Sequence, residues 1–262
     1  MARETESLAD YAAALRYEDI PDDVIERAKQ CIADTIAVTI FGSDLPWSRM
    51  VARFAERNAP GGDSRILALG GARVHAPAAA LANGAFAHAF EMDNLTWPNT
   101  GVHPGATLLA PGLAMAQERG NSGRDLIAAV VAGAEVMIRI GRATHHRNET
   151  RGYHAPGTTG PFGAAVACGR LLGLDGPRMR NALGVAGSLA GGLLEFARSG
   201  TGAMVKRLHL GRAAESGVLA ASLAADGFTG PATVLEGEFG FLNVFCGGEF
   251  DRAELTRELG QS

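Results

Sequence analysis

At residues 204–214 the chain reads MVKRLHLGRAA, where a glycine-rich segment gives way to an apolar helix predicted over 208–226. Lys206 and His209 are three residues apart and therefore share a helix face. The start of a helix is a natural anion site, so these two cations would suit a carboxylate-rich substrate. In the structural alternative the lysine extends to solvent and the histidine is hydrogen-bonded in the core. These residues alone favour the structural alternative, and two further clusters change that balance.

Helical patterns dominate the whole chain, because apolar residues recur at helical spacing between recognisable start and stop signals. Ser122 with Asp125 three residues later, for example, forms a near capping box. The predicted helices cover residues 21–42, 46–57, 76–91, 106–117, 123–142, 159–172, 177–196 and 208–226. Residues 145–156 are predicted to be irregular, and strands 65–69 and 73–75 to pair around a Gly-Gly turn. We therefore predict one all-α domain with a minor β-hairpin.

Composition narrows the class of protein. The hydrophobic content of 47% and charged content of 20% are ordinary for a globular protein. A net charge of -4 without a basic tract argues against a nucleic-acid partner, and the most apolar stretch, 126–140, is too short to span a membrane. The 35 glycines have no period and indicate closely packed helices. Three distant cysteines and a polar, acidic start indicate a cytoplasmic protein without a disulfide framework.

The first cluster of chemically competent residues is a polar loop after an alanine-rich helix. It carries Asp93, Thr96 and His103, and such loops on a rigid scaffold can converge on one point. Glu91 and Asp93 lie at the predicted helix end, where the helix dipole disfavours carboxylates, so their placement needs a reason. His88 and Glu91 share a helix face and could be a structural hydrogen-bonded pair. A metal site of His88, Asp93 and His103 matches no ligand-spacing signature, and no metal is predicted.

The second cluster is RGYHAPGTTG at residues 151–160, where His154 precedes a Pro-Gly turn and a threonine-rich helix start. Taken alone, His154 would be interpreted as a surface or capping residue, and Tyr153 could equally be a packing residue. Lys206 repeats the theme of a cationic side chain at a helix end bounded by glycine or proline. The sequence has no nucleophile elbow, phosphate-binding loop or dinucleotide fingerprint. The inventory therefore favours acid–base chemistry without a cofactor, on an anionic substrate.

Ordered blocks along nearly the whole chain carry a family resemblance. They are GARV at 71–74, LANGAFAHAFEMD at 81–93, HP at 103–104, YHAPG at 153–157, KRLHLGRAA at 206–214 and GFTGPATVLEG at 227–237. Together they resemble the 2-methylcitrate dehydratase (MmgE/PrpD) family, which also includes cis-aconitate decarboxylases and an iminodisuccinate epimerase. The resemblance implies a large helical domain with a smaller α/β lid, an active site between the two, and no metal or other cofactor.

The resemblance also assigns residues to the active site. Four positions match closely and are expected to be catalytic, and three further residues are expected to bind substrate. They are Asp93, His103, His154 and Lys206 in the first group, and Thr96, Tyr153 and His209 in the second. The match of Thr96 is looser, because NLTWPN at 94–99 departs from the acidic run usual before the His-Pro pair. This departure bears on the substrate more than on the fold.

These residues would support a lyase that acts on a small di- or tricarboxylic acid. His103 and His154 would transfer protons and bind carboxylates, in an order left open, and Lys206 would hold a substrate carboxylate. Asp93 would orient a histidine or act as the base itself. Dehydration of a 2-methylcitrate-like hydroxy acid is the preferred expectation. Decarboxylation and epimerisation need the same groups and remain open.

Residues 255–260 resemble the family segment that precedes the lid. The sequence is therefore expected to form a single helical domain over residues 1–262 without the α/β lid. The competing expectation is a non-catalytic or half-enzyme helical subunit that needs a lid-bearing partner. A surface without its lid would expose apolar side chains, which usually mark an interface. We therefore expect a homodimer, with a separate lid-bearing chain as the alternative.

Overall fold

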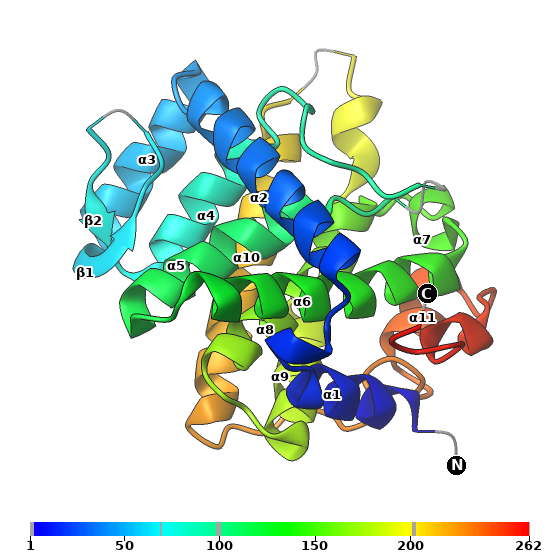
Figure 1. The fold of residues 1–262 in the computed structure, drawn as a ribbon. Helices are drawn as coiled ribbons and strands as arrows, with labels where there is room; N and C mark the ends of the chain where they lie inside the picture. Colours follow the sequence, from blue (N-terminus) through cyan, green and yellow to red (C-terminus); the bar gives the residue numbers. More distant parts are fainter. Residues whose placement is uncertain (1–2, 69, 98–100, 201–202, 262) are drawn as a thin grey trace.

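Helix α8 (Ala155–Leu171) is buried along nearly its whole length. Its residues are small or apolar on every side, so the helix has no polar face and needs neighbours all round. Helices α6 (Gly123–Thr144), α9 (Gly176–Ser188) and α10 (Val205–Ala225) pack against it. The computed structural model describes residues 3–261 apart from 69, 98–100 and 201–202 (Figure 1).

Further helices surround this centre, and α4 packs closely on α10. The remaining helices and strands are α1 (Glu4–Ala14), α2 (Asp22–Gly42), α3 (Pro46–Asn58), β1 (Pro60–Arg65), β2 (Arg73–Val74), α4 (Ala76–Ala87), α5 (Ala110–Arg119), α7 (Arg147–Thr150) and α11 (Phe241–Cys246). A π-helical turn, Gly105–Leu109, leads into α5, and short 3-10 helices cover Tyr17–Asp19, Leu194–Ala197 and Arg252–Leu255. The predicted all-α architecture with one minor hairpin is confirmed. Within the described part of the chain, no helix is long and apolar enough to cross a membrane.

Small residues let α10 approach its neighbours closely. A Cβ atom built on Gly211 would lie 2.3 Å from the carbonyl oxygen of Leu81 in α4. One built on Gly217 would lie 2.2 Å from the Cβ atom of Ala164 in α8. No side chain fits at such distances in a close-packed interior, so both crossings require glycine. At these two crossings, glycine therefore marks tightly packed helices, as predicted.

The segment after α9 departs most from the sequence-based prediction. The helix predicted over 177–196 ends at Ser188. The backbone N–H of Gly191 donates to the Gly157 carbonyl (3.1 Å), and the Gly192 carbonyl accepts from the N–H of His154 (3.0 Å). Gly192 has a φ of 125°, a conformation that favours glycine. The chain therefore leaves the helix and runs beside the start of α8, which itself begins at Ala155 rather than at residue 159.

Two other differences have tertiary causes. The first strand is Pro60–Arg65 rather than 65–69, since the N–H of Leu67 donates to Oδ1 of Asn83 (2.8 Å) instead of to the partner strand. Local patterns do not predict α1 or the short α7 within the segment 145–156. Helix α1 is held by distant residues, including an ion pair between Glu4 and Arg252 (2.7 Å).

Candidate active site

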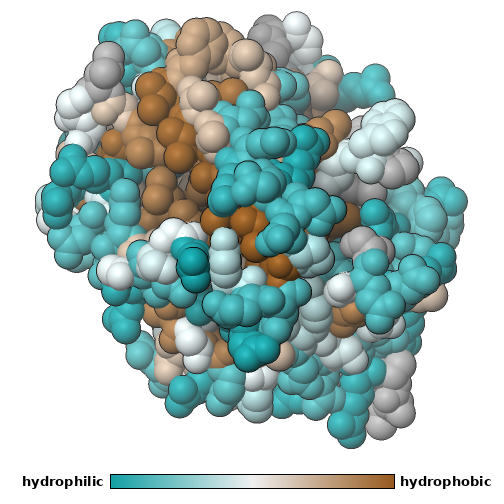
Figure 2. All heavy atoms as spheres, viewed as in Figure 1, coloured by the Kyte–Doolittle hydropathy of each residue, from teal (hydrophilic) through white to brown (hydrophobic). Residues whose placement is uncertain are grey.

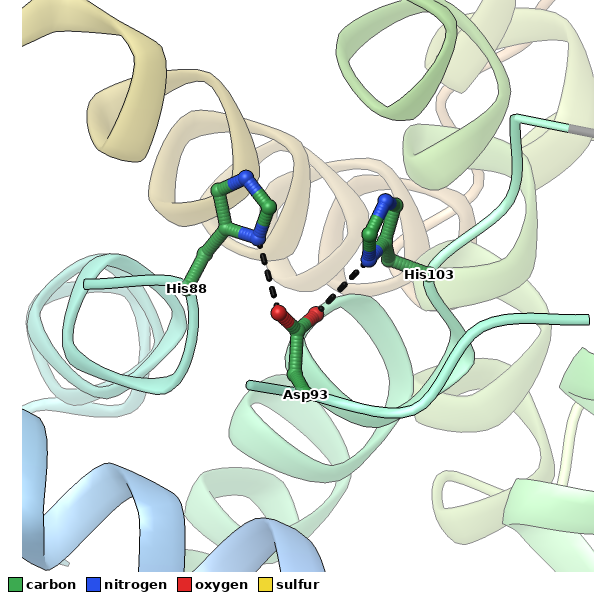
Figure 3. Close-up of side chains that lie close together, drawn as sticks. All are labelled: His88, Asp93 and His103. Carbon is green, nitrogen blue, oxygen red and sulfur yellow. Dashed lines mark hydrogen bonds and ion pairs between the residues drawn. The ribbon is translucent and has the colours of Figure 1, made fainter. Parts of the chain in front are cut away.

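Asp93 lies between two imidazole rings. Helix α4 ends at Ala87, four residues before the predicted end, and His88 follows it directly. The Nδ1 atom of His88 lies 2.8 Å from Oδ1 of Asp93, and Nδ1 of His103 lies 3.1 Å from Oδ2 (Figure 3). Each ring thus donates to its own oxygen of one carboxylate. The predicted pair between His88 and Glu91 is therefore wrong, because the early helix end turns His88 toward Asp93.

The Asp93 carboxylate is ionised in this setting. Its side chain is fully buried, and burial alone would raise the pKa of the carboxyl. Hydrogen bonds from His103 and His88 outweigh burial and lower the pKa of Asp93 to about 2. In Figure 3 the Nε2 atoms of both rings lie on the side away from the carboxylate. The His103 side chain is 19% exposed, so its Nε2 atom is the one placed to meet a ligand.

A second imidazole pair lies beside the first. His154, which precedes α8, has its Nδ1 atom 3.1 Å from Nδ1 of His209 in α10, and its ring centroid 6.3 Å from that of His88. The pKa of His154 is lowered to about 3. Burial is the largest cause, and repulsion from His209 is the next. Burial also lowers the pKa of His209. Both rings are therefore mainly neutral at neutral pH.

Lys206 places a positively charged side chain in this region. It lies in the first turn of α10, which begins at Val205 rather than at the predicted residue 208, and its Nζ atom is 2.5 Å from Oε2 of Glu91. The same Nζ atom lies 5.7 Å from the centroid of the Phe196 ring. Glu91 has a φ of 58°, which is uncommon for a residue other than glycine. The backbone turn after α4 therefore delivers a carboxylate to the lysine that was predicted to hold a substrate carboxylate.

A hollow of about 600 Å³ reaches this region at His209, which is the one predicted site residue among the described residues of its lining. The loop after α9 and the start of α10 form its walls, with Phe196, His209 and Arg212 among the lining residues. Phe196 packs edge-on against His154, with ring centroids 5.0 Å apart. Pockets of this size commonly hold small organic ligands. An apolar wall with a few convergent polar groups suits a small carboxylic acid.

Comparison with known proteins places the chain in a family. The model of the MmgE/PrpD N-terminal domain matches residues 6–253. The chain belongs to the MmgE/PrpD family. It is 34% identical to the cis-aconitate decarboxylase-like protein oryM of Aspergillus oryzae, over 98% of this chain and 55% of that protein. It is 35% identical to a cis-aconitate decarboxylase of Aspergillus terreus (98% and 54% covered) and 32% identical to that of Homo sapiens (90% and 49% covered).

These figures confirm the predicted family. The MmgE/PrpD chain spans about half the length of the curated relatives it matches. The structure brings five of the seven predicted site residues into one region. They lie on the segment between α4 and α5, directly before α8, and near the start of α10. They are Asp93, His103, His154, Lys206 and His209.

Tyr153 and Thr96 face other surroundings in the MmgE/PrpD chain. The Tyr153 ring packs edge-on against Phe245, with centroids 4.8 Å apart, and its backbone bridges Leu193. Thr96 lines a separate hollow between α2 and α6, and its backbone N–H donates to the carbonyl of Val102 (3.3 Å). The substrate-binding roles of these two residues stay predictions.

His88, Glu91 and Phe196 are the site residues to which the sequence assigned no role there. The signal for His88 was present in its spacing from Asp93, but the predicted helix ran past it to Glu91. Phe196 fell inside a helix predicted to continue beyond Ser188, so its position beside His154 was not foreseeable.

The ligand atoms of His88, Asp93 and His103 all lie within 4.8 Å of one another, a grouping that could hold a metal ion. In the structure both Nδ1 atoms instead lie at hydrogen-bond distance from separate oxygens of the carboxylate. The geometry is explained by hydrogen bonds, and the expected absence of a metal stays a prediction.

Proposed function

We propose that this MmgE/PrpD chain is the helical part of a lyase that acts on a small tricarboxylate by acid–base catalysis. One observation carries the proposal: the ionised Asp93 between two imidazoles lies beside the neutral pair His154 and His209 and the cation Lys206. The names of the relatives support decarboxylation of a cis-aconitate-like substrate as the reaction.

Decarboxylation of an allylic carboxylate needs one proton donor and a good anion site. When the bond to the departing carboxylate breaks, carbon dioxide leaves and the electron pair stays on the carbon skeleton. The pair shifts the double bond, and the far allylic carbon takes up one proton. A tricarboxylate trianion and one proton thus give carbon dioxide and an unsaturated dicarboxylate dianion. The protein must hold the carboxylates and deliver that proton.

The electrostatics of the site suggest how the roles divide. Asp93 accepts from Nδ1 of His103 and leaves its Nε2 atom on the side away from the carboxylate, which suits His103 to the role of proton donor at Nε2. The pKa of about 3 keeps His154 neutral, so a ring N–H of His154 would donate a hydrogen bond to a substrate carboxylate. Lys206 would exchange Glu91 for a second carboxylate of the substrate.

Dehydration of a 2-methylcitrate-like hydroxy acid is the second candidate. It requires an unprotonated base for a C–H proton, and the lowered pKa of His154 keeps that ring unprotonated at neutral pH. Epimerisation by removal and return of a proton would use the same base. None of the three relatives described above is named for either reaction, so we rank dehydration and epimerisation below decarboxylation.

Proton NMR in D₂O tests the proposal on the purified chain with cis-aconitate, 2-methylcitrate, citrate and a panel of amino-dicarboxylates. We expect loss of cis-aconitate and one deuterium in the dicarboxylate product. Loss of 2-methylcitrate with cis-aconitate untouched would select dehydration. If a folded sample changed none of them, the chain would be a helical subunit that needs a lid-bearing partner.

We also propose that the chain forms a homodimer through an apolar surface over the end of α2, α3 and the loop after α4 (Figure 2). The residues of this surface, the α2–α3 patch, are Ile40, Phe41, Met50, Phe54, Phe90 and Met92. Phe41 is 60% exposed although its ring stacks on Phe90, with centroids 4.7 Å apart. Exposed apolar surface of this kind usually marks an interface. A separate lid-bearing chain is the alternative occupant.

A further inference from the structure

We propose that His88 is a positioning residue of this site, which holds the Asp93 carboxylate in the rotation that lets its other oxygen orient His103. The inference rests on the proposed function only in that His103 is taken as the proton donor. His88 itself acts through Asp93, and no contact with the substrate is assigned to it.

A carboxylate held by one hydrogen bond can still rotate about its Cβ–Cγ bond. Here Oδ1 accepts from His88 and Oδ2 accepts from His103, at 2.8 and 3.1 Å (Figure 3). The two rings meet edge to face, with centroids 4.9 Å apart and planes inclined by 77°. Two donors on different oxygens define the carboxylate plane, so the orientation of His103 depends on the bond from His88.

The two ends of this arrangement differ in rigidity. His88 follows directly on α4, whose residues are buried from Ala78 to Ala87. Asp93 and His103 lie on the loop between α4 and the π-helical turn at Gly105. Groups that must hold a reacting side chain are more precise when they stand on a packed helix than on a loop. His88 therefore transfers the fixed position of α4 to the loop.

The surroundings of His88 argue against a role in packing alone. Its side chain is 1% exposed, and its Nε2 atom is buried without a hydrogen-bond partner among the residues that the structure describes. A buried polar atom left unpaired costs about 1–3 kcal/mol, a cost that an apolar ring of similar shape would avoid. The bond from Nδ1 to Asp93 is the interaction that offsets this cost.

Two substitutions separate the hydrogen bond from the volume of the ring. In His88→Asn the side-chain amide keeps a donor near the position of Nδ1, whereas His88→Phe keeps a ring and removes the donor. His88→Ala removes the donor without adding volume, and replaces the phenylalanine variant if circular dichroism finds that variant unfolded. His75→Phe is the control, because His75 is a 56% exposed histidine paired with Glu118.

The first readout is the ring ¹⁵N NMR spectrum of His103 in the 262-residue chain. At a pH at which the His103 ring is neutral, we expect a single tautomer protonated at Nδ1 in the wild type, His88→Asn and His75→Phe, and a mixture of tautomers in His88→Phe. An unchanged His103 spectrum in a folded His88→Phe variant would overturn the proposal. So would a spectrum of His88→Asn that matches His88→Phe, because the donor would then not be the property that matters.

The second readout is turnover of cis-aconitate. We expect kcat to fall by about 10- to 100-fold in His88→Phe, the range seen when an outer partner of a functional histidine is lost, while KM changes little and His88→Asn recovers most of the rate. Equal kcat values for the wild type and His88→Phe would overturn the proposal. If the wild type itself has no turnover, the proposed function fails for this chain, and the NMR spectra still decide the role of His88.

Discussion

The Nδ1 atom of His154 lies 3.1 Å from the Nδ1 atom of His209, although the two residues are 55 positions apart in the chain. Only one of these nitrogens can carry the proton that they share, and a second positive charge at this distance is disfavoured. Burial acts in the same direction and lowers the pKa of both rings. The site therefore sets a neutral imidazole pair beside an ionised aspartate, and different surroundings assign different roles to similar groups.

We expect the chain to lose stability as the pH falls from about 6.5 to about 3. The folded state holds the pKa of His154 at about 3, against 6.5 as its ordinary value. Between these values the unfolded chain binds more protons than the folded chain, so the free energy of unfolding falls with pH. Above the ordinary value both states are unprotonated and the contribution of His154 is fully present. The lowered pKa of His209 acts in the same direction.

Urea unfolding at a series of pH values measures this dependence. His154→Gln cannot titrate, so its free energy of unfolding should fall less over the same pH range. Parallel curves for the two proteins would mean that His154 is not held neutral in the folded state.

Replacing Lys206 by alanine should remove carboxylate binding and turnover while leaving the helical circular-dichroism signal intact. The lysine is one of two in the chain, and it is the one beside the imidazole pairs. Truncation of a partly buried charge that binds an anion typically costs about 2–5 kcal/mol, or roughly 30-fold or more in affinity. Isothermal titration with citrate and the NMR assay give the two readouts. Lys29→Ala is the matched control, since Lys29 is an exposed residue paired with Glu26. Parallel loss of fold and activity would indicate a structural lysine.

Replacing Glu91 by glutamine should strengthen binding of a carboxylic acid. The Glu91 carboxylate lies 2.5 Å from Nζ of Lys206, where a substrate carboxylate would compete with it. Removing the competing charge leaves the lysine available, and we expect Kd for citrate to fall about threefold to tenfold, as for loss of one partly exposed ion pair. Weaker binding in Glu91→Gln would instead assign Glu91 to the support of Lys206.

Replacing Gly211 by alanine should destabilise the protein. The new Cβ atom would lie 2.3 Å from the Leu81 carbonyl oxygen, so α4 and α10 would have to move apart. Overpacking of this kind costs about 1–3 kcal/mol, measured by urea or thermal unfolding. Gly123→Ala provides the contrast, because no atom lies within 4 Å of its new methyl group at the start of α6. That variant should be neutral or slightly more stable, by up to about 1 kcal/mol. Equal effects of the two substitutions would contradict the close crossing.

The proposed dimer can be tested through Phe41, which is 60% exposed in the α2–α3 patch. Light scattering after size-exclusion chromatography should give a dimer for the wild type and a monomer for Phe41→Glu, because a charge in an apolar interface is left unpaired and desolvated. Leu219→Glu is the control, as an exposed leucine on α10 outside the patch. A monomeric wild type would exclude the homodimer and direct the search to a different chain.

The helices could be predicted from the sequence because the patterns that indicate them involve residues close together in the chain. The start of α6 follows from Ser122 and Asp125, whose side chains bond reciprocally to each other's backbone N–H at 3.2 and 2.8 Å. Apolar residues at helical spacing likewise predicted most of the other helices, although α10 begins at Val205 and so includes Lys206, which lies before the predicted start at residue 208. The same local rules failed for the loop after α9, where Gly191 and Gly192 bond to residues more than thirty positions away in the chain.

The sequence by itself determined the helices, the family and the residue types that converge on the site, because helical periodicity, caps and ordered motifs depend on residues close together in the chain. The tertiary structure alone decided that α4 ends before His88, that Asp93 is shared by two rings and that Glu91 covers Lys206. These contacts join α4, α10 and the loop between α4 and α5. Their geometry depends on how closely the glycines allow those helices to pack, and no local pattern encodes that distance.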